Sequence, residues 1–343
     1  MIALLLAAGF ALIVSLVGTP FLISWLRAHG LGQPIREEGP QTHLTKAGTP
    51  TMGGLMIVIG AVVGYVGAHL RDGAVFTWGG MLTMAAIIGA GAVGLLDDYI
   101  KVRDRKGISG KTKMAGLLVV AVLFAWGVLV KADVSTMLSF TRLDSLDLDL
   151  GPILWVVLAI VLFTGFTNAV NLTDGLDGLA AGSGSFSYTA YVVIAFWAFR
   201  HPEVYDIPQA LDLALVAAAM VGACAGFLWW NAAPAQIIMG DTGSLAIGAG
   251  LAALALVTNT HLLLPIIGGI YVIETVSVML QVATFRLLKR RVFRMAPVHH
   301  HFELLGWPET TIIIRFWILA AMATAMAVGI FYADYLSIPG VID

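Results

Sequence analysis

Five aspartates lie at the borders of long apolar segments. They are Asp97 and Asp98 in "GLLDDYIKV", Asp174 and Asp177 in "NLTDGLDG", and Asp241 in "MGDTGS". Carboxylates gathered in one cleft repel one another unless a cation neutralises them, and Mg²⁺ commonly combines one or two carboxylates with substrate phosphates. The five acids therefore predict a magnesium and phosphate site. Each acid alone would also fit a solvated helix end, and Asp174 or Asp241 would fit an N-cap.

Glycines and basic residues near these acids favour the same chemistry. The glycines of "TDGLDG" and "MGDTGS" let the backbone turn tightly, and they leave N–H groups able to bind an anion at a helix start. Helix capping uses the same residue types, so neither motif is specific by itself. Three lysines are candidates to hold pyrophosphate oxygens, namely Lys46, Lys111 and Lys113. Anionic lipid headgroups and membrane topology better explain the other basic residues nearby, which are Lys101, Arg103, Arg105 and Lys106.

Three consecutive histidines, His299, His300 and His301, follow a proline in "PVHHHFELLGW". They cannot all face one metal from a regular helix, and in an extended loop His299 and His301 would point one way and His300 the other. A zinc site would want acids or cysteines nearby, and only Glu303 is close, so hydrogen bonding to a polar substrate is favoured over metal ligation. The neutral side chains Asn171 and Asn231 lie in the same set of polar segments.

The elements that must position these residues are membrane-spanning helices. The chain has 343 residues, of which 59% are hydrophobic and 12% are charged, about half the charged content of a soluble domain. Apolar segments long enough to cross a bilayer recur along it. The sequence therefore predicts an all-α polytopic membrane protein of one domain with about ten spans, at 1–26, 52–70, 76–96, 114–131, 151–170, 183–199, 208–230, 244–259, 262–285 and 311–333. Glu274, inside the ninth span, is costly in lipid and needs a partner that the sequence does not identify.

Ten spans place five polar segments on one face of the membrane, at 27–51, 97–113, 171–182, 231–243 and 286–310. These segments and their flanks hold 15 of the 19 basic residues, so the positive-inside rule makes this face cytoplasmic and puts both termini on the periplasmic or extracellular side. All candidate site residues lie on the cytoplasmic face. The alternation in residues 133–150 predicts a small hairpin on the outer face.

The polar motifs resemble those of the MraY family, within the polyprenyl-phosphate N-acetylhexosamine-1-phosphate transferase superfamily. The resemblance runs through "GPQTHLTKAGTPTMGG", "GLLDDYIKV", "NAVNLTDGLDGLA", "IIMGDTGSLAIG" and "PVHHHFELLGWPE", in this order and over essentially the whole chain. The acidic motifs are shared across the superfamily. The unbroken "HHHFE" and the "HLTKAGTPTMGG" segment resemble the MraY branch rather than its GlcNAc-1-phosphate relatives.

The resemblance implies an Mg²⁺-dependent transfer of phospho-MurNAc-pentapeptide from UDP-MurNAc-pentapeptide to undecaprenyl phosphate, which gives lipid I and UMP. It also implies a bacterial inner-membrane location and a homodimer, with no nucleic-acid partner. Asp241 resembles the family's metal ligand, and Asp97, with Asp98 beside it, resembles the base. Contacts to nucleotide, diphosphate and sugar are implied for Lys46, Lys113, Asn171, Asp174, Asp177, Asn231, His299, His300 and His301. One-step and two-step mechanisms both stay open, with direct displacement favoured.

Three other functions are weaker interpretations of the same residues. A sister transferase that uses UDP-GlcNAc is disfavoured by the histidine run. A secondary transporter would place its ionisable groups near the bilayer midplane and show repeated halves, whereas here the acids gather at one face. A purely structural scaffold would not need five acids with glycine-rich neighbours.

Overall fold

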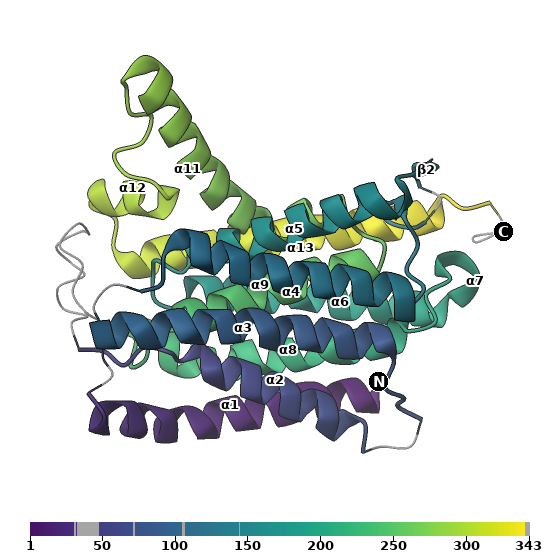
Figure 1. The fold of residues 1–343 in the computed structure, drawn as a ribbon, viewed down its shortest axis with the longest axis horizontal. Helices are drawn as coiled ribbons and strands as arrows, with labels where there is room; N and C mark the ends of the chain where they lie inside the picture. Colours follow the sequence, from purple (N-terminus) through teal and green to yellow (C-terminus); the bar gives the residue numbers. More distant parts are fainter. Residues whose placement is uncertain (31, 33–47, 71–72, 105–106, 144, 340–343) are drawn as a thin grey trace.

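The computed structural model describes residues 1–30, 32, 48–70, 73–104, 107–143 and 145–339. Its long helices run side by side in one bundle (Figure 1). Nine of the described helices are long and apolar enough to cross a membrane, and a tenth, α2, is shorter. They are α1 (Ile2–Ala28), α2 (Gly54–Ala68), α3 (Trp78–Asp104), α4 (Gly110–Lys131), α5 (Gly151–Thr173), α6 (Leu179–Arg200), α8 (Ala210–Asn231), α9 (Gly240–Val257), α11 (Gly269–Leu288) and α13 (Glu309–Leu336). The predicted all-α polytopic architecture is confirmed.

Short elements connect the long helices. The predicted hairpin is confirmed as β1 (Met137–Leu138) paired antiparallel with β2 (Leu148–Asp149). Three helices are only a few residues long, namely α7 (Pro202–Tyr205), α10 (Leu264–Ile267) and α12 (Val298–Leu304). The ninth predicted span, 262–285, is therefore divided into α10 and α11.

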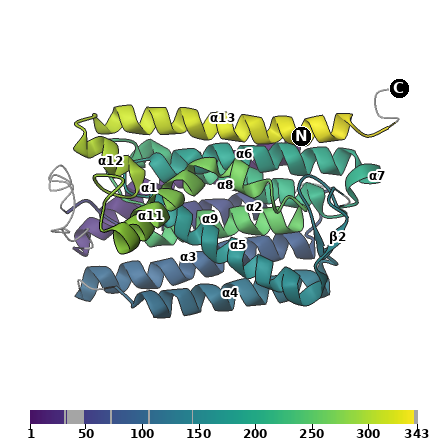
Figure 2. The same cartoon turned by 90° about the horizontal axis from the view of Figure 1, so that it is seen from above.

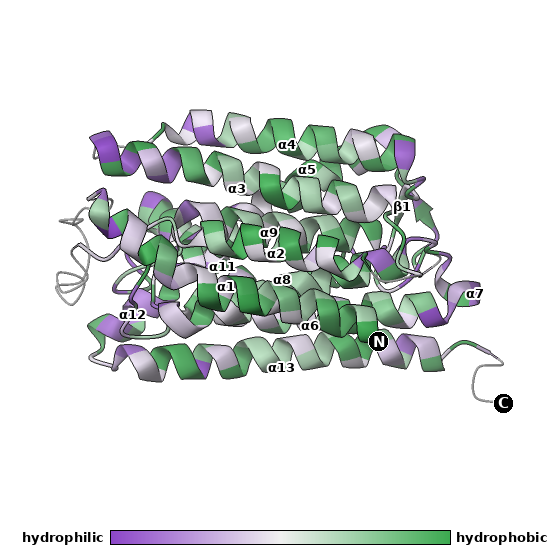
Figure 3. Ribbon diagram, turned by 90° about the horizontal axis from the view of Figure 1, so that it is seen from below, coloured by the Kyte–Doolittle hydropathy of each residue, from purple (hydrophilic) through white to green (hydrophobic). Residues whose placement is uncertain are grey.

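The core of the bundle is α9, in which every residue from Asp241 to Val257 is buried. Helices α3 and α5 pack against it, while α8 packs among α1, α2 and α6. Hydrophobic residues colour the middle of the bundle and hydrophilic residues gather towards its two ends (Figure 3). This distribution matches a bundle whose middle lies in the hydrocarbon of a bilayer and whose ends meet water.

The two ends of the bundle differ. The start of α1 and the end of α13 lie at the end that carries the hairpin and α7, whereas α12 lies at the opposite end (Figures 1 and 2). At this second end α3 extends to Asp104, so Asp97 and Asp98 lie inside the helix rather than in a segment after it. Helix α11 leaves the bundle at an angle, and its C-terminal half stands away from the other long helices (Figure 1).

His261 joins the segment after α9 to the hairpin. Its ring is fully buried, and its Nδ1 accepts a hydrogen bond from the Ser139 backbone N–H at 3.2 Å. Burial lowers the pKa of His261 to about 4, so the imidazole is neutral in the folded protein at neutral pH.

We expect acid to destabilise the protein through His261. Because its folded pKa lies below the unfolded value of about 6.5, the unfolded chain takes up the proton first. The stabilisation is complete above pH 6.5 and declines as the pH falls towards 4, by about 3 kcal/mol in all. Thermal unfolding in detergent between pH 7.5 and 4.5 measures this loss. His261→Asn keeps an acceptor for Ser139 but cannot take the proton, so its curve should be flatter; parallel curves would assign the acid sensitivity to other groups.

Candidate functional site

Four helices bring five polar side chains together at the α12 end of the bundle. Lys101 Nζ of α3 lies 2.7 Å from Asp97 Oδ2 and 2.8 Å from Asp241 Oδ2 of α9. Lys113 of α4 also contacts Asp241, and its Nζ lies 3.5 Å from Asp97 Oδ2. Asn171 of α5 donates from Nδ2 to Asp241 Oδ1 at 2.8 Å. We call these residues, Asp97, Lys101, Lys113, Asn171 and Asp241, the carboxylate–lysine cluster.

The charges of this cluster balance. Asp97 is 2% exposed and Asp241 is 9% exposed, so an unpaired negative charge on either would be costly. The ammonium groups of Lys101 and Lys113 lie between them, and the Ile108 backbone N–H donates to Asp97 Oδ1 at 2.8 Å. All four carboxylate oxygens therefore have a partner in the resting arrangement.

The close approach of α3 to α9 sets the position of the cluster. A Cβ at Gly94 would come within 2.2 Å of the Asp241 carbonyl oxygen, so only glycine lets the two backbones come this close. This contact lies one turn before Asp97 on α3 and directly at Asp241 on α9. The glycine therefore helps to bring together two carboxylates that are far apart in sequence.

Asp98 points to the N-terminus of α9 rather than joining the cluster. It accepts hydrogen bonds from the backbone N–H groups of Asp241 and Thr242, at 3.0 and 2.9 Å, and from Thr242 Oγ1 at 2.7 Å. Gly240, with φ +72°, precedes them in a conformation that favours glycine. The expectation that Asp241 or Asp174 is an N-cap is wrong, because Asp98 caps α9 from another helix and Asp174 lies at the C-cap of α5.

A second set of hydrogen bonds ties the α5–α6 turn to the α8–α9 segment. Asp177 Oδ2 accepts from the Ala235 N–H at 2.9 Å. Asn231 Oδ1 accepts from the Gly178 N–H at 3.0 Å, and its Nδ2 donates to the Ile237 carbonyl at 2.9 Å. Asn231 Oδ1 thus joins the two segments, and its Nδ2 holds the α8–α9 segment to the end of α8. Asp177 and Gly178 of "NLTDGLDG" therefore contact the α8–α9 segment, whereas Asn171 belongs to the cluster.

The three histidines are helical, so the predicted loop at 286–310 contains a short helix. They lie in α12 and point in three directions, because successive residues of a helix differ by about 100°. His300 Nδ1 lies 2.6 Å from Glu303 Oε2 one turn further on, and His301 Nδ1 accepts from the Arg294 N–H at 3.0 Å. The i,i+3 pair of His300 and Glu303 favours this short helix.

His299 is the partner of Glu274. Its Nδ1 lies 3.0 Å from Glu274 Oε1 of α11, and both side chains are fully buried. Its ring also covers Gly175, where a Cβ would come within 2.2 Å of His299 Nε2. This pair therefore joins α11 and α12 to the turn that carries Asp174 and Asp177.

The oxygen donors of the cluster fit a hard divalent cation. Asp97 Oδ2 and Asp241 Oδ2 already share one cationic centre, the ammonium of Lys101. Two carboxylates are the number that Mg²⁺ commonly takes from protein, with substrate phosphates and water completing its shell. Among the described residues, no group of three or more His, Cys, Asp or Glu side chains is arranged to hold a metal by itself. The cluster thus suits a metal that binds together with a phosphate substrate.

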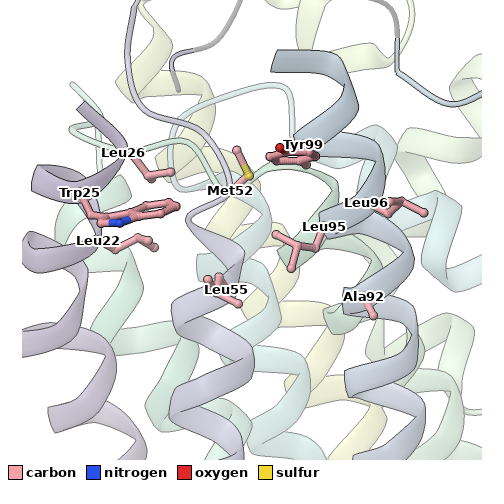
Figure 4. Close-up of a pocket in the computed structure, with 9 residues that line it drawn as sticks. All are labelled: Leu22, Trp25, Leu26, Met52, Leu55, Ala92, Leu95, Leu96 and Tyr99. Carbon is pink, nitrogen blue, oxygen red and sulfur yellow. The ribbon is translucent and has the colours of Figure 1, made fainter. Parts of the chain in front are cut away.

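An apolar pocket of about 450 Å³ lies at this end of the bundle among α1, α2 and α3 (Figure 4). Leu22 and Trp25 of α1, Leu55 of α2, and Leu95 and Tyr99 of α3 are among the side chains that line it. Its walls are almost entirely apolar, so it would accept hydrocarbon but not a charged group. Leu95 and Tyr99 place it on a different face of α3 from Asp97.

Two lysines show the limits of the sequence interpretation. Lys46 lies outside the described residues, so its predicted role stays a prediction. Lys101, assigned from sequence to membrane topology, instead bridges two carboxylates of the cluster. The signal for this role was its i,i+4 spacing from Asp97 on a helix.

Comparisons with known proteins identify relatives over the full length. A family model described as glycosyl transferase family 4 matches residues 79–259, and phospho-N-acetylmuramoyl-pentapeptide-transferase signature 1 matches residues 46–58. A phospho-N-acetylmuramoyl-pentapeptide-transferase of Frankia casuarinae is 52% identical and covers 97% of this chain and 98% of its own. Those of Rhodococcus opacus and Kineococcus radiotolerans are 48% and 45% identical, with coverage of 97% or more on both sides.

Proposed function

Because this chain belongs to the phospho-N-acetylmuramoyl-pentapeptide-transferase family, we propose that its carboxylate–lysine cluster carries out the transfer of phospho-MurNAc-pentapeptide to a lipid phosphate. The donor is UDP-MurNAc-pentapeptide, the acceptor is undecaprenyl phosphate, and the products are lipid I, a precursor of peptidoglycan, and UMP. The observation that carries the assignment is the pair Asp97 and Asp241 sharing Lys101 and Lys113 at a polar end of an apolar bundle. A lipid phosphate and a water-soluble nucleotide can meet only at such a boundary.

The reaction exchanges one phosphoanhydride for another. An oxygen of the lipid phosphate bonds to the β-phosphorus of the UDP-sugar, and the bond from that phosphorus to the bridging oxygen breaks. The bridging oxygen leaves with its electron pair on the α-phosphate of UMP. Positioning and charge neutralisation carry most of such a transfer. The two lysines supply positive charge where the diphosphate would lie, and a second phosphate pKa near 6 leaves little work for a base. We assign that small role to Asp97.

We further propose direct displacement without a phospho-enzyme. Asp97 Oδ2 and both oxygens of Asp241 are held by lysine or asparagine, and Asp97 Oδ1 accepts from Ile108 N–H. A carboxylate oxygen so engaged is a poorer nucleophile, because its cationic and hydrogen-bond partners stabilise its lone pairs. A lipid phosphate, in contrast, arrives with free oxygens.

Asp241 and Asp97 are the residues that would hold Mg²⁺ in this proposal. The ion, when bound with substrate, would neutralise charge on the transferring phosphate. With Asp97 and Asp241 holding the ion, Lys101 and Lys113 would be available to phosphate oxygens. Asn171 would keep Asp241 oriented through its amide.

The turn after α5 is our proposed nucleotide-binding segment, with Asp174 and Asp177 as its acidic residues and Lys46 and the histidines near the diphosphate and sugar. We treat Asn231 and Asp98 as positioning residues, since their polar atoms are used within the protein. The apolar pocket among α1, α2 and α3 would suit hydrocarbon of a lipid substrate. We also propose that this end of the bundle faces the cytoplasm, in the bacterial inner membrane, and that the enzyme is a homodimer.

The test is UMP release from UDP-MurNAc-pentapeptide by the purified protein in detergent. We expect release only when undecaprenyl phosphate and Mg²⁺ are both present, with lipid I formed in equal amount. Release of UMP without the lipid would contradict direct displacement and indicate a phospho-enzyme. Activity with UDP-GlcNAc but not with the MurNAc substrate would overturn the substrate assignment, and no release under any condition from folded protein would overturn the function.

Gly175→Ala should reduce the rate of transfer about 10²-fold while the protein stays folded. The new methyl group would lie 2.2 Å from His299 Nε2, so the ring must move and the nucleotide turn must separate from α12. A misplacement of about 1 Å can cost this much in an enzyme. Steady-state kinetics with both substrates measures the effect, and Gly165→Ala, which meets nothing within 4 Å, is the matched control. Equal rates for the two variants would mean that contact between His299 and Gly175 does not matter.

A further inference from the structure

The segment that follows α11 is strongly cationic. Five basic residues lie between positions 286 and 294, namely Arg286, Lys289, Arg290, Arg291 and Arg294, and no Asp or Glu occurs from 275 to 302. None of these residues takes part in the cluster or in the proposed transfer. Basic residues are common at a cytoplasmic membrane boundary, so their number alone indicates only membrane topology. The arrangement of three of the five residues indicates more.

Arg286, Arg291 and Arg294 line one pocket of about 660 Å³ between α11 and the segment leading to α12. Within the described part of the chain, no carboxylate forms a salt bridge with any of the three guanidinium groups. Three like charges around one hollow repel one another unless an anion neutralises them. The pocket therefore has the charge of an anion-binding site, and planar guanidinium groups favour phosphate.

Hydrogen bonds fix the segment that forms this pocket. Gln281 Oε1 accepts from the N–H groups of Val292 and Phe293, at 3.1 and 3.0 Å, and its Nε2 donates to the Phe293 carbonyl at 2.9 Å. These three bonds hold the segment after α11 back against the helix. Arg294 Nη1 also donates to the Leu304 carbonyl at 2.7 Å, at the end of α12.

The remaining wall of the pocket is apolar and exposed. Val282 and Phe285 line it, and they are also 43% and 48% exposed on the helix that stands away from the bundle (Figure 1). Leu287 and Leu288 beside them are 81% and 67% exposed. A ligand that satisfies both walls must have an anionic head and a hydrocarbon tail. A free phosphate would leave the apolar wall uncovered.

We propose that this pocket binds an anionic glycerophospholipid of the surrounding membrane, with its phosphate held by Arg286, Arg291 and Arg294 and its acyl chain along Val282 and Phe285. The bound lipid also supports α12, because Arg294 holds the Leu304 carbonyl and donates its N–H to His301. The pocket would thus anchor α12 to the membrane surface at the helix that carries His299.

The test compares two double variants of equal charge. Arg286→Gln with Arg291→Gln removes two pocket charges, and Lys289→Gln with Arg290→Gln removes two from the same segment outside the pocket. Full-length protein in neutral detergent is titrated with fluorescent phosphatidylglycerol or phosphatidylcholine. We expect phosphatidylglycerol to bind the wild type at least about tenfold more tightly than phosphatidylcholine. We expect about tenfold weaker binding in the pocket variant and little change in the control.

Three results would overturn the proposal. Equal losses in the two double variants would show diffuse attraction, and equal affinity of the wild type for the two lipids would show that charge does not matter. Displacement of the lipid by millimolar glycerol phosphate would show that the tail contributes nothing. The lipid comparison on the wild type stands even if the pocket variant fails to fold, and binding does not depend on the proposed transferase reaction.

Discussion

Asp241→Asn is expected to reduce UMP release about 10³-fold while the protein stays folded. The substitution preserves shape but removes the charge that Lys101, Lys113 and Asn171 all contact. Two ammonium groups would then face Asp97 alone, and the cluster would lose half of its negative charge. A metal bound with the diphosphate would lose one of its two protein carboxylates, and the loss of one preorganised electrostatic contact commonly costs 10²- to 10³-fold in rate.

The measurement is kcat for UMP release across a Mg²⁺ titration, together with the unfolding temperature. The matched control is Asp133→Asn, an exposed aspartate at φ 47°, a conformation that asparagine also tolerates. The control should retain wild-type activity. If Asp241→Asn lost activity but regained it fully at higher Mg²⁺, the residue would contribute only affinity for the ion. If the variant kept wild-type kcat, the cluster would not be the site of transfer.

Much of the fold could be predicted because lipid leaves few choices. A spanning segment must satisfy its backbone internally, so each long apolar stretch becomes a helix. The junction near His261 was harder, since a four-residue α10 is too short to leave a periodic signal. The helix of His299 to His301 was missed for a similar reason. Beside the local pair of His300 and Glu303, the helix is held by contacts with Glu274 and Arg294, which local propensity does not reveal.

The sequence predicts which residue types form the site but not which of them contact one another. Asp97, Asn171, Lys113 and Asp241 were identified by chemistry, and the structure brings all four together. The sequence does not reveal that Asp98 turns away to cap α9, because α3 and α9 meet through a glycine contact between residues more than 140 positions apart. Two adjacent aspartates on one helix point about 100° apart, so neighbouring carboxylates seldom share a role.

Because Asp98 caps α9 while Asp97 belongs to the cluster, replacing Asp98 should affect both activity and stability. Asp98→Asn should lower kcat about 10²-fold and lower the unfolding temperature by several degrees. Asparagine keeps one acceptor oxygen but turns an NH₂ group towards the Asp241 or Thr242 N–H, which leaves a buried donor unpaired at a cost of about 2 kcal/mol. The start of α9 would also lose the negative charge that favours its N-terminus. Because Asp241 is the second residue of α9, its carboxylate would shift with the helix.

The pH profile and a graded variant separate this role from proton transfer. If Asp98 positions α9, the pH profile of kcat in Asp98→Asn keeps the wild-type shape at a lower height. Thr242→Val removes one of the three hydrogen bonds, so its kcat and its unfolding temperature should fall less than those of Asp98→Asn. A flattened acidic limb in Asp98→Asn, with an unchanged unfolding temperature, would make Asp98 the base and refute its assignment as the cap of α9.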